Sequence, residues 1–411
     1  MKPVTPDIEW NRAVGGVRCR RPFRLRRLGH IGINVADVHR CIDFYQRLFG
    51  FVLSDELDLA PRFKDDATRL AAGNTTGFFL RHGTEHHSMG IFPKRALNAL
   101  AGFPPLRESF SLNQIAWQVG SLDEVAGGIE WFQSLEVPIL RLGRDLPGSN
   151  FHVYPVDGEH HVNELFYAME QIGWYERSKP VGVYERLLVP AQRPHVSHRA
   201  ELRRAAERGI DLLSGYLPAT PTEERFDVGG MLLAQPFKVE RMGPVRLFVQ
   251  DLDAEIAFYR DVMGMKLTEE VVWNGHRCAF FRVNTEHHSL ALYPFALRAE
   301  LGLSEHTTCM SFALQLGDYT QLRDAIGFLR GHGVEIRYLP PELFPGINYT
   351  AFAIDPDGNA VQLFYYMEQI GWSGQPRPQE QRPTIDNARW PDCVEEPSDA
   401  FMGEVYLGPP G

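Results

Sequence analysis

The stretch LGHIGINVADVHRCIDFYQRLFGF, residues 28–51, has a close counterpart in MGPVRLFVQDLDAEIAFYRDVMGM, residues 242–265. The first copy begins with a short apolar run and continues with apolar residues at helical spacing, which end at Gly50. This pattern predicts a strand followed by an amphipathic helix. Because the same pattern occurs twice, we expect the chain to contain a duplicated unit.

Two further pairs of segments repeat in the same order along the chain. TEHHSMGIFP at 84–93 matches TEHHSLALYP at 285–294, and MEQIGW occurs at 169–174 and again at 367–372. The halves differ by insertions. The largest insertion lies between Phe51 and Thr84 in the N-terminal copy. Together the three pairs indicate duplication of a whole domain.

Each half shows the same order of elements twice. For the N-terminal half, the apolar patterns predict these elements: strand 30–35, helix 37–50, strands 78–83 and 87–93, then strand 112–119, helix 122–135 and strands 151–156 and 161–167. The C-terminal half repeats this order. We therefore expect two mixed α and β domains, over residues 25–175 and 241–372.

The remaining segments lack this pattern. Residues 176–240 are rich in proline at their start and contain one predicted helix over 198–215, closed by Gly215, so we interpret them as a linker. Residues 373–411 are rich in proline, glutamine and acidic residues, and we expect a tail that either wraps the surface or reaches a neighbouring subunit.

Composition narrows the possible partners and locations. Of the 411 residues, 44% are hydrophobic and 23% are charged, as in an ordinary soluble protein, and no apolar run approaches the length of about 20 residues that a bilayer requires. The net charge of -10 argues against nucleic acid as a partner. The five cysteines are scattered without CxxC spacing, which is typical of reduced thiols. We expect a cytoplasmic protein without membrane partners.

The strand–helix–strand–strand–strand module, used four times, resembles the vicinal oxygen chelate superfamily. That group includes glyoxalases, epimerases, antibiotic-resistance proteins and type I extradiol ring-cleaving dioxygenases. Two such halves, together with the TEHHS segments, are most similar to the two-domain extradiol dioxygenases. The resemblance implies an α+β fold of four βαβββ modules, which form two domains, each a cup of paired curved mixed sheets with a divalent metal on its floor.

The resemblance also assigns ligand positions. In the N-terminal half they are His30, Gln114 and Glu164. The matched residues of the C-terminal half are Pro244, Ser311 and Gln362. Proline has no side-chain donor atom and a neutral amide brings no charge to a dication, so we expect a metal only in the N-terminal half.

The ligand at position 114 separates two kinds of chemistry. Similar dioxygenases carry a histidine there, whereas glyoxalases and epimerases of the superfamily use amide oxygens. His160, four residues before Glu164, is a further candidate: it either ligates the metal in place of the missing histidine, supports a ligand by a hydrogen bond, or only occupies a turn.

Three more residues have counterparts in similar dioxygenases. The second histidine of the pair, His87, is the expected acid/base catalyst, with His86 as its supporting neighbour. Tyr154 matches a tyrosine that hydrogen-bonds a substrate oxygen, and Phe352 replaces it in the C-terminal half. The pair recurs as His287 and His288 in the half without ligands, so a structural role for it stays open.

Three functions follow as hypotheses. The leading one is a metal-dependent extradiol-type dioxygenase of aromatic catabolism, a homo-oligomer that uses Fe(II) and O2 on a small catechol-like aromatic diol. The second is a glyoxalase-like or epimerase-like lyase or isomerase that uses Mn, Zn, Ni or Co without redox chemistry. The third is a metal-free protein that binds an aromatic compound in the cup.

Overall fold

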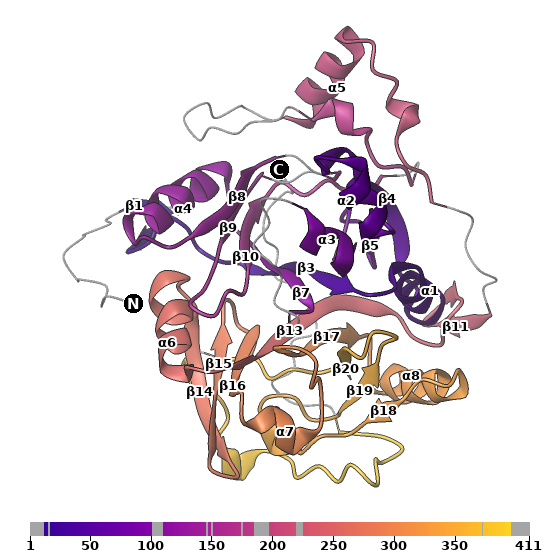
Figure 1. Cartoon of the computed structure of the whole chain (residues 1–411). Helices are drawn as coiled ribbons and strands as arrows, with labels where there is room; N and C mark the ends of the chain where they lie inside the picture. The colour runs from indigo at the N-terminus through magenta and orange to yellow at the C-terminus, as the bar shows by residue number, and fades with distance from the viewer. Residues whose placement is uncertain are drawn as a thin grey trace.

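The computed structural model shows two similar halves stacked against each other, with the C-terminal half below the N-terminal half in Figure 1. The structure describes residues 12–14, 17–100, 110–144, 147–148, 151–173, 176–184, 197–218, 225–371 and 373–395. Parts of the predicted linker and tail, at 185–196, 219–224 and 396–411, therefore lie outside the described residues.

The N-terminal half is built from eight strands, β3 to β10, that form one sheet. The strands of this sheet are β3 (Arg27–Val35), β4 (Val52–Asp58), β5 (Thr76–Arg81), β6 (Met89–Pro93), β7 (Leu112–Gln118), β8 (Ile139–Gly143), β9 (Phe151–Pro155) and β10 (Asn163–Tyr167). The helices are α1 (Val38–Phe49), η1 (Ala60–Arg62), α2 (Asp66–Ala72), α3 (Lys94–Ala99) and α4 (Leu122–Ser134). The short strands β1 (Arg12–Val14) and β2 (Val17–Cys19) pair separately.

The C-terminal half repeats this plan. Its strands are β13 (Val239–Val249), β14 (Lys266–Trp273), β15 (His276–Arg282), β16 (Leu290–Pro294), β17 (Cys309–Leu316), β18 (Ile336–Arg337), β19 (Thr350–Ile354) and β20 (Ala360–Phe364). Its helices are α6 (Leu252–Ala257), the π-helical η4 (Phe258–Val262), α7 (Leu297–Leu301), α8 (Tyr319–Gly331), η5 (Pro341–Leu343) and η6 (Gln379–Gln381). Between the halves lie η2 (Val181–Val183), α5 (His198–Glu207), η3 (Leu212–Ser214), β11 (Phe226–Val228) and β12 (Met231–Leu233).

The two large sheets have the same strand order. The first runs β4-β5-β6-β3-β7-β10-β9-β8 and the second runs β14-β15-β16-β13-β17-β20-β19-β18. In each, the first strands of the two modules pair antiparallel at the centre, and each first strand pairs parallel with the last strand of its own module. The predicted α+β fold of four modules in two cups of mixed sheet is confirmed.

The repeated stretch that begins each half folds as its pattern predicts. Asp37 caps α1 by accepting a hydrogen bond from the Arg40 backbone, and Gly50 ends the helix with a φ of 72°. In the second copy the helix is divided, because α6 passes into the π-helical turn η4.

Two predicted elements have other bounds in the structure. The linker helix was expected to reach Gly215, but α5 ends at Glu207 and is followed by Gly209 with a φ of 69°. A left-handed backbone there interrupts the helix, and η3 is a separate turn. The strand predicted over 87–93 begins only at Met89, so His86 and His87 lie in the bend before β6.

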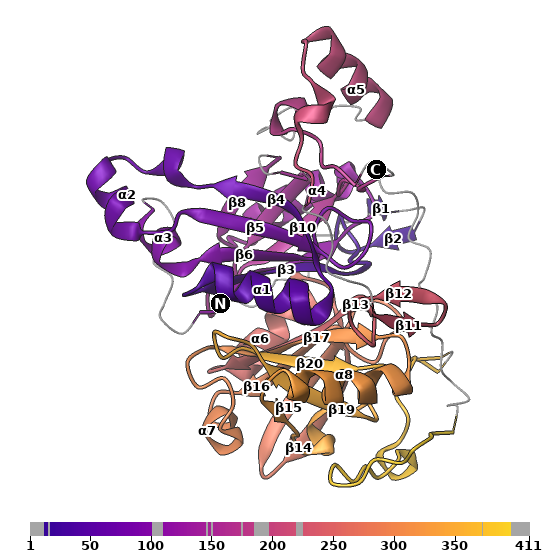
Figure 2. The ribbon, with the colours of Figure 1, turned by 90° about the vertical axis from the view of Figure 1, so that its right-hand side faces the viewer.

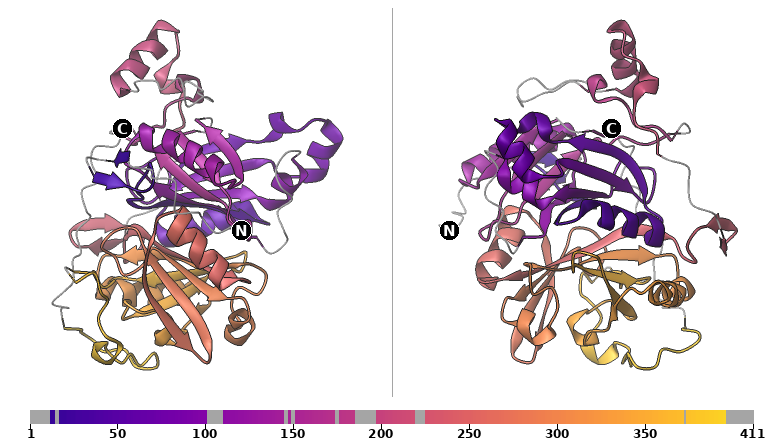
Figure 3. Two further views of the ribbon diagram at one scale, coloured as in Figure 1. Left: turned by 90° about the vertical axis from the view of Figure 1, so that its left-hand side faces the viewer. Right: turned by 45° about the vertical axis from the view of Figure 1, so that its right-hand side comes forward.

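One part of the linker, around α5, projects away from the duplicated body. Figures 1, 2 and 3 all show α5 at the end of the molecule that is remote from the C-terminal half. Its Glu201 forms an ion pair with Arg144 of the N-terminal half and another with Lys179 of the linker itself. Within the described part of the chain, no helix has the length and apolar character needed to cross a bilayer.

Matched contacts join the halves. The Tyr45 hydroxyl donates to Asp355 at 2.9 Å, and its counterpart Tyr259 donates to Asp157 at 2.9 Å. Each half therefore places one tyrosine against one buried carboxylate of the other half. The large hydrophobic core is shared in the same way, because it includes buried residues of both sheets.

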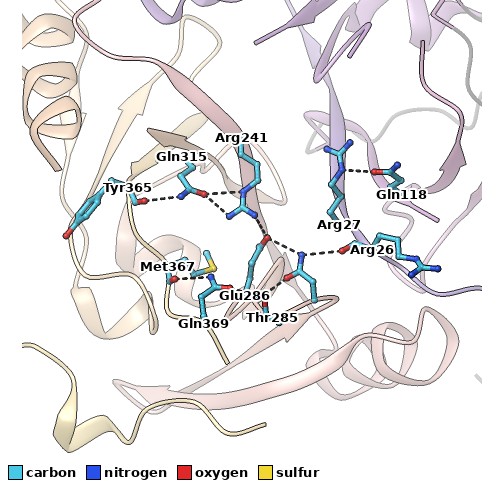
Figure 4. Close-up of polar contacts among 11 residues, drawn as sticks. Arg26, Arg27, Gln118, Arg241, Thr285, Glu286, Gln315, Tyr365, Met367 and Gln369 are labelled. Carbon is cyan, nitrogen blue, oxygen red and sulfur yellow. Dashed lines mark hydrogen bonds and ion pairs between the residues drawn. The ribbon is translucent and has the colours of Figure 1, made fainter. Parts of the chain in front are cut away.

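A polar network on the first strands is also duplicated (Figure 4). Arg27 donates to Gln118 at 2.6 Å, and Arg241 donates to Gln315 at 2.7 Å. Asn284 links this region to the other half by donating to the Arg26 carbonyl at 3.2 Å. Since the contact between arginine and glutamine occurs in both halves, it supports the fold rather than marks one half as the active one.

Candidate metal and catalytic site

Strand register brings the three predicted ligands to one face of the N-terminal sheet. On neighbouring strands, His30 and Glu164 both lie opposite Ala116, and Gln114 lies opposite Gly32. Because side chains alternate along a strand, Gln114 shares a face with Ala116, and therefore with His30 and Glu164. The other face carries the apolar core.

His30 and Glu164 form a buried pair. The distance from His30 Nε2 to Glu164 Oε2 is 3.0 Å, and the side chains are 1% and 0% exposed. Burial alone raises the pKa of Glu164, but the charge and hydrogen bond of His30, with smaller contributions from His152 and Arg141, hold it below its ordinary value. A charged carboxylate is thus maintained inside the cup.

Gln114 lies against a glycine. A Cβ atom at Gly32 would come within 2.2 Å of Gln114 Oε1, so any side chain at position 32 would displace the amide. Within the described residues, Gln114 Oε1 and His30 Nδ1 have no hydrogen-bond partner although both are buried. Buried polar atoms of this kind usually indicate a ligand or ion that completes their contacts.

His152 joins the cluster, and the sequence interpretation missed it. It lies on β9 opposite Phe166, on the same face as Glu164, and its Nδ1 is 4.0 Å from Glu164 Oε1. A signal was present, because His152 precedes Tyr154 by two residues and alternation puts both on one face. The matched residue of the other half is Thr350.

Tyr154 lies beside the same carboxylate. Burial raises the pKa of Tyr154 well above its usual value, and the charge of Glu164 adds to this effect. The Arg141 guanidinium on β8 lies 4.5 Å from the centre of the phenol ring. The hydroxyl therefore remains protonated at neutral pH, as a hydrogen-bond donor must.

His87 contacts His30 directly. Their ring centres are 4.5 Å apart with a nearly perpendicular arrangement, and His87 Nδ1 lies 3.0 Å from His86 Nδ1. His86 Nε2 in turn lies 3.4 Å from Asp55 Oδ2. Burial, followed by the neighbouring His30 and His86, lowers the pKa of His87, so its imidazole is neutral.

The predicted candidate His160 is not part of this cluster. It occupies an exposed turn with a φ of 74°, whereas His30 and Glu164 are buried. The buried histidine of the EHHVNE segment is its neighbour His161, which contacts Asp157 at 3.0 Å and Thr308 of the other half at 3.1 Å. Of the alternatives for His160, the structure favours the turn residue.

Among the residues that the structure describes, the matched cup of the C-terminal half has no metal-ligand set. Ser311 and Gln362 are buried with side-chain atoms that lack hydrogen-bond partners in the described chain, and Phe352 is buried in place of the tyrosine. Arg246, which matches Gly32, is fully buried in this cup.

The donor atoms of the N-terminal cup suit a divalent ion. Nowhere in the described residues do three His, Cys, Asp or Glu side chains form a group arranged to hold a metal. The N-terminal cup offers instead one imidazole, one carboxylate and the open amide oxygen of Gln114. One charged and two neutral donors fit a divalent ion of borderline softness, with coordination positions left for a substrate.

Both halves of the chain match a known protein family. The family model described as Glyoxalase/Bleomycin resistance protein/Dioxygenase superfamily matches residues 27–165 and 241–363. No curated protein sequence matches the chain.

Several solved structures have the same fold. BphC, a halotolerant catechol dioxygenase, is 13% identical with a TM-score of 0.52, covering 86% of this chain and 91% of its own. The Mn(II)-bound glyoxalase from Novosphingobium aromaticivorans is 12% identical with a TM-score of 0.52, covering 85% of each chain. A catechol 2,3-dioxygenase is 16% identical with a TM-score of 0.50, covering 88% and 93%. At such identities the likeness concerns the fold. With both of its halves matched by the family model, the chain belongs to the glyoxalase/bleomycin resistance protein/dioxygenase superfamily.

Proposed function

We propose that the N-terminal cup is a metal-dependent active site and that the chain is an extradiol-type dioxygenase of a catechol-like diol. The observation that carries this proposal is the buried pair of His30 and Glu164, with the unpartnered Gln114 oxygen on the same face and His87 against it. The C-terminal cup has the same fold and retains His288 at the position of His87, but its residues at the three matched ligand positions are Pro244, Ser311 and Gln362.

His30, Gln114 and Glu164 are the residues that would hold the metal. When bound, a divalent ion supplies Lewis acidity to the two oxygens of a diol and, as Fe(II), the electron chemistry that ring cleavage with O2 requires. The glycine at position 32 keeps the floor of the cup open above Gln114. The strands supply the donors from a rigid, buried surface, which limits the water that reaches the reacting oxygens.

His87 is assigned the proton transfer, and its tautomer follows from its partners. Asp55 can only accept, so His86 Nε2 carries a proton and His86 Nδ1 accepts. The proton between the two rings then belongs to His87 Nδ1, at 3.0 Å. His87 Nε2 is left as an acceptor, ready to take a hydroxyl proton from a diol and to return it to the product.

Tyr154 is assigned a positioning contact with a substrate oxygen. Its hydroxyl remains protonated beside Glu164, and Arg141 adds positive charge at the same side of the cup. An oxygen that becomes anionic during the reaction is stabilised by a donor fixed in advance in a water-poor site.

A second candidate function is favoured by one residue. The amide of Gln114 occupies the place of a second histidine, and it is a neutral, hard oxygen donor. With Mn, Zn, Ni or Co, the same residues would stabilise an enediolate and move protons in a glyoxalase-like lyase or isomerase. In that reaction His87 keeps the same role as a base.

Metal content measured on purified protein distinguishes these functions. We expect about one equivalent of iron in the wild-type protein, its loss in His30→Ala and its retention in Pro244→Ala, the matched position of the other half. Manganese, zinc or nickel in place of iron favours the lyase or isomerase. Protein without metal contradicts both enzymes and favours the metal-free binding protein.

The reaction itself is tested by adding catechols without oxygen and then admitting oxygen. A yellow ring-opened product that forms in the wild-type protein and in Pro244→Ala, but not in His30→Ala, supports the dioxygenase. Iron-loaded protein that forms no product from any catechol contradicts it.

A further inference from the structure

The cup of the C-terminal half contains a buried cation. Arg246 lies on β13 and is 0% exposed. Its Nη2 donates to His288 Nε2 at 3.0 Å, and its guanidinium lies 5.1 Å from the centre of the Phe344 ring. Within the described residues, no carboxylate pairs with Arg246, and its Nε and Nη1 make no hydrogen bond.

The acceptor of that one hydrogen bond is neutral. His288 Nδ1 lies 3.0 Å from His287 Nδ1, and His287 Nε2 lies 2.8 Å from Glu269 Oε1. Since arginine can only donate, His288 Nε2 must be unprotonated, and the remaining protons of the pair point toward Glu269. The negative charge of Glu269 is therefore separated from Arg246 by two imidazole rings.

Two other polar side chains of this cup also lack partners. Arg246 lies opposite Ser311, and Gln362 lies opposite Ala313, two residues further along β17. Alternation along β17 thus puts Arg246, Ser311 and Gln362 on one face, across three adjacent strands of the sheet (Figure 1). The Ser311 hydroxyl and both amide atoms of Gln362 are buried without a hydrogen bond in the described chain.

Such a cluster is costly without a ligand. Burying an unpaired charge costs far more than burying a paired one, and each unsatisfied polar atom adds to the cost. Burial lowers the pKa of Arg246, while the neighbouring Tyr293 and Cys309 raise it. An anion inside the cup would accept hydrogen bonds from the Arg246 guanidinium, the Ser311 hydroxyl and Gln362 Nε2 at once.

We propose that the C-terminal cup is a binding site for the carboxylate of a small organic acid, held by Arg246, Ser311 and Gln362. One guanidinium and neutral donors match a single negative charge, and the planar donor group of arginine fits the two oxygens of a carboxylate. The buried rings of Phe344 and Phe352, 5.1 Å apart, make the surroundings of Arg246 apolar, which favours an acid with an apolar body. The site does not depend on the reaction of the N-terminal half.

The test measures binding of acetate and benzoate to the full chain by titration calorimetry and by the shift in Tm, at constant ionic strength with chloride as the balancing anion. We expect saturable binding of one carboxylate per chain and a rise in Tm, because a ligand that binds only the folded state stabilises it. In Arg246→Met both effects are lost. In Arg241→Met, on the same strand but paired with Glu286, both remain.

A second variant keeps the test decisive if the first does not fold. Ser311→Ala retains the charge and removes one donor, so we expect carboxylate affinity to fall about tenfold or more, as for a lost hydrogen bond to a charged group. Carboxylate binding that is absent in the wild-type protein, or unchanged in both Arg246→Met and Ser311→Ala, contradicts the proposal. So does a Tm response that chloride alone reproduces.

Discussion

The two halves share a fold and a relay, which is a chain of contacts from one carboxylate through two histidines, and they differ in the residue that the second histidine contacts. In the N-terminal half, the relay runs from Asp55 through His86 to His87. The His87 ring packs against His30, which lies two residues before Gly32. In the C-terminal half, the matched relay ends at the Arg246 guanidinium. A buried histidine pair is thus not by itself a sign of catalysis, because the same pair orients a proton acceptor toward two different groups.

The pair itself is held identically in both cups. The distance between the two Nδ1 atoms is 3.0 Å in each, and a glycine with positive φ, Gly148 or Gly346, lies against the first histidine. The difference arises on the first strand, where Gly32 leaves space for the Gln114 amide and Arg246 fills the corresponding space. On that strand, His30 and Gly32 in one half and Pro244 and Arg246 in the other thus distinguish the cup proposed for a cation from the cup proposed for an anion.

The largest expected effect comes from giving the N-terminal cup the arginine of the C-terminal one. Gly32→Arg would displace Gln114 and put a positive charge beside the proposed ligands, so we expect metal content and turnover to fall by at least about a thousandfold, at the scale of losing a buried charge interaction. Metal analysis and steady-state turnover measure this. Gly83→Arg, where an added Cβ meets no atom within 4 Å, is the control. Full metal content in Gly32→Arg would contradict the proposal that metal binding needs the space beside Gly32.

Removal of the proton acceptor should affect turnover but not metal content. In His87→Asn we expect turnover to fall by about 10²- to 10⁴-fold, the usual contribution of general acid/base catalysis, with the metal retained. Single-turnover kinetics on metal-loaded protein measure this step. If turnover persists, His87 has the structural role that the C-terminal copy also permits.

A smaller effect is expected at the outer end of the relay. Asp55→Asn removes the acceptor that fixes the tautomers of both histidines, so we expect about a tenfold loss of turnover and an altered pH profile, with KM for the diol unchanged. The matched change Glu269→Gln in the C-terminal half should leave turnover unaltered. Equal losses in both variants would point to a general effect on folding.

The smallest effect concerns stability at the contact between the halves. Burial, the charges of Asp157 and Glu159, and smaller contributions raise the pKa of Glu255 to about 9 from an ordinary value of 4.5. Between these values the folded protein holds a proton that the unfolded chain has released, so the free energy of unfolding falls as pH rises. In Glu255→Gln we expect a shallower fall between pH 5 and pH 9 in urea denaturation. A slope equal to that of the wild-type protein would contradict this assignment.

Much of the site followed from the sequence because duplication supplied an internal comparison. The loss of donors at Pro244, Ser311 and Gln362 identified the half that retains His30 and Glu164. The part that the sequence did not resolve concerns two neighbouring residues. His160 and His161 are adjacent, and only the left-handed turn at His160 decides which of them is buried.

Other residues were beyond a single sequence because their roles depend on strands far apart in the chain. His86, for example, lies near Asp55 through the approach of a bend to β4. The contact of Gly32 with Gln114 also could not be predicted, because it depends on the strand register that puts the two residues opposite each other.

The sequence by itself determined the repeated modules, the helix limits at Asp37 and Gly50, and the half that keeps the candidate ligands, since periodicity, caps and the comparison of copies are local properties of the chain. The tertiary structure decided which buried groups meet. It placed His87 against His30 and left Arg246 without a counter-charge in the described chain, because strand register and the closure of each cup bring together residues that no spacing along the chain relates.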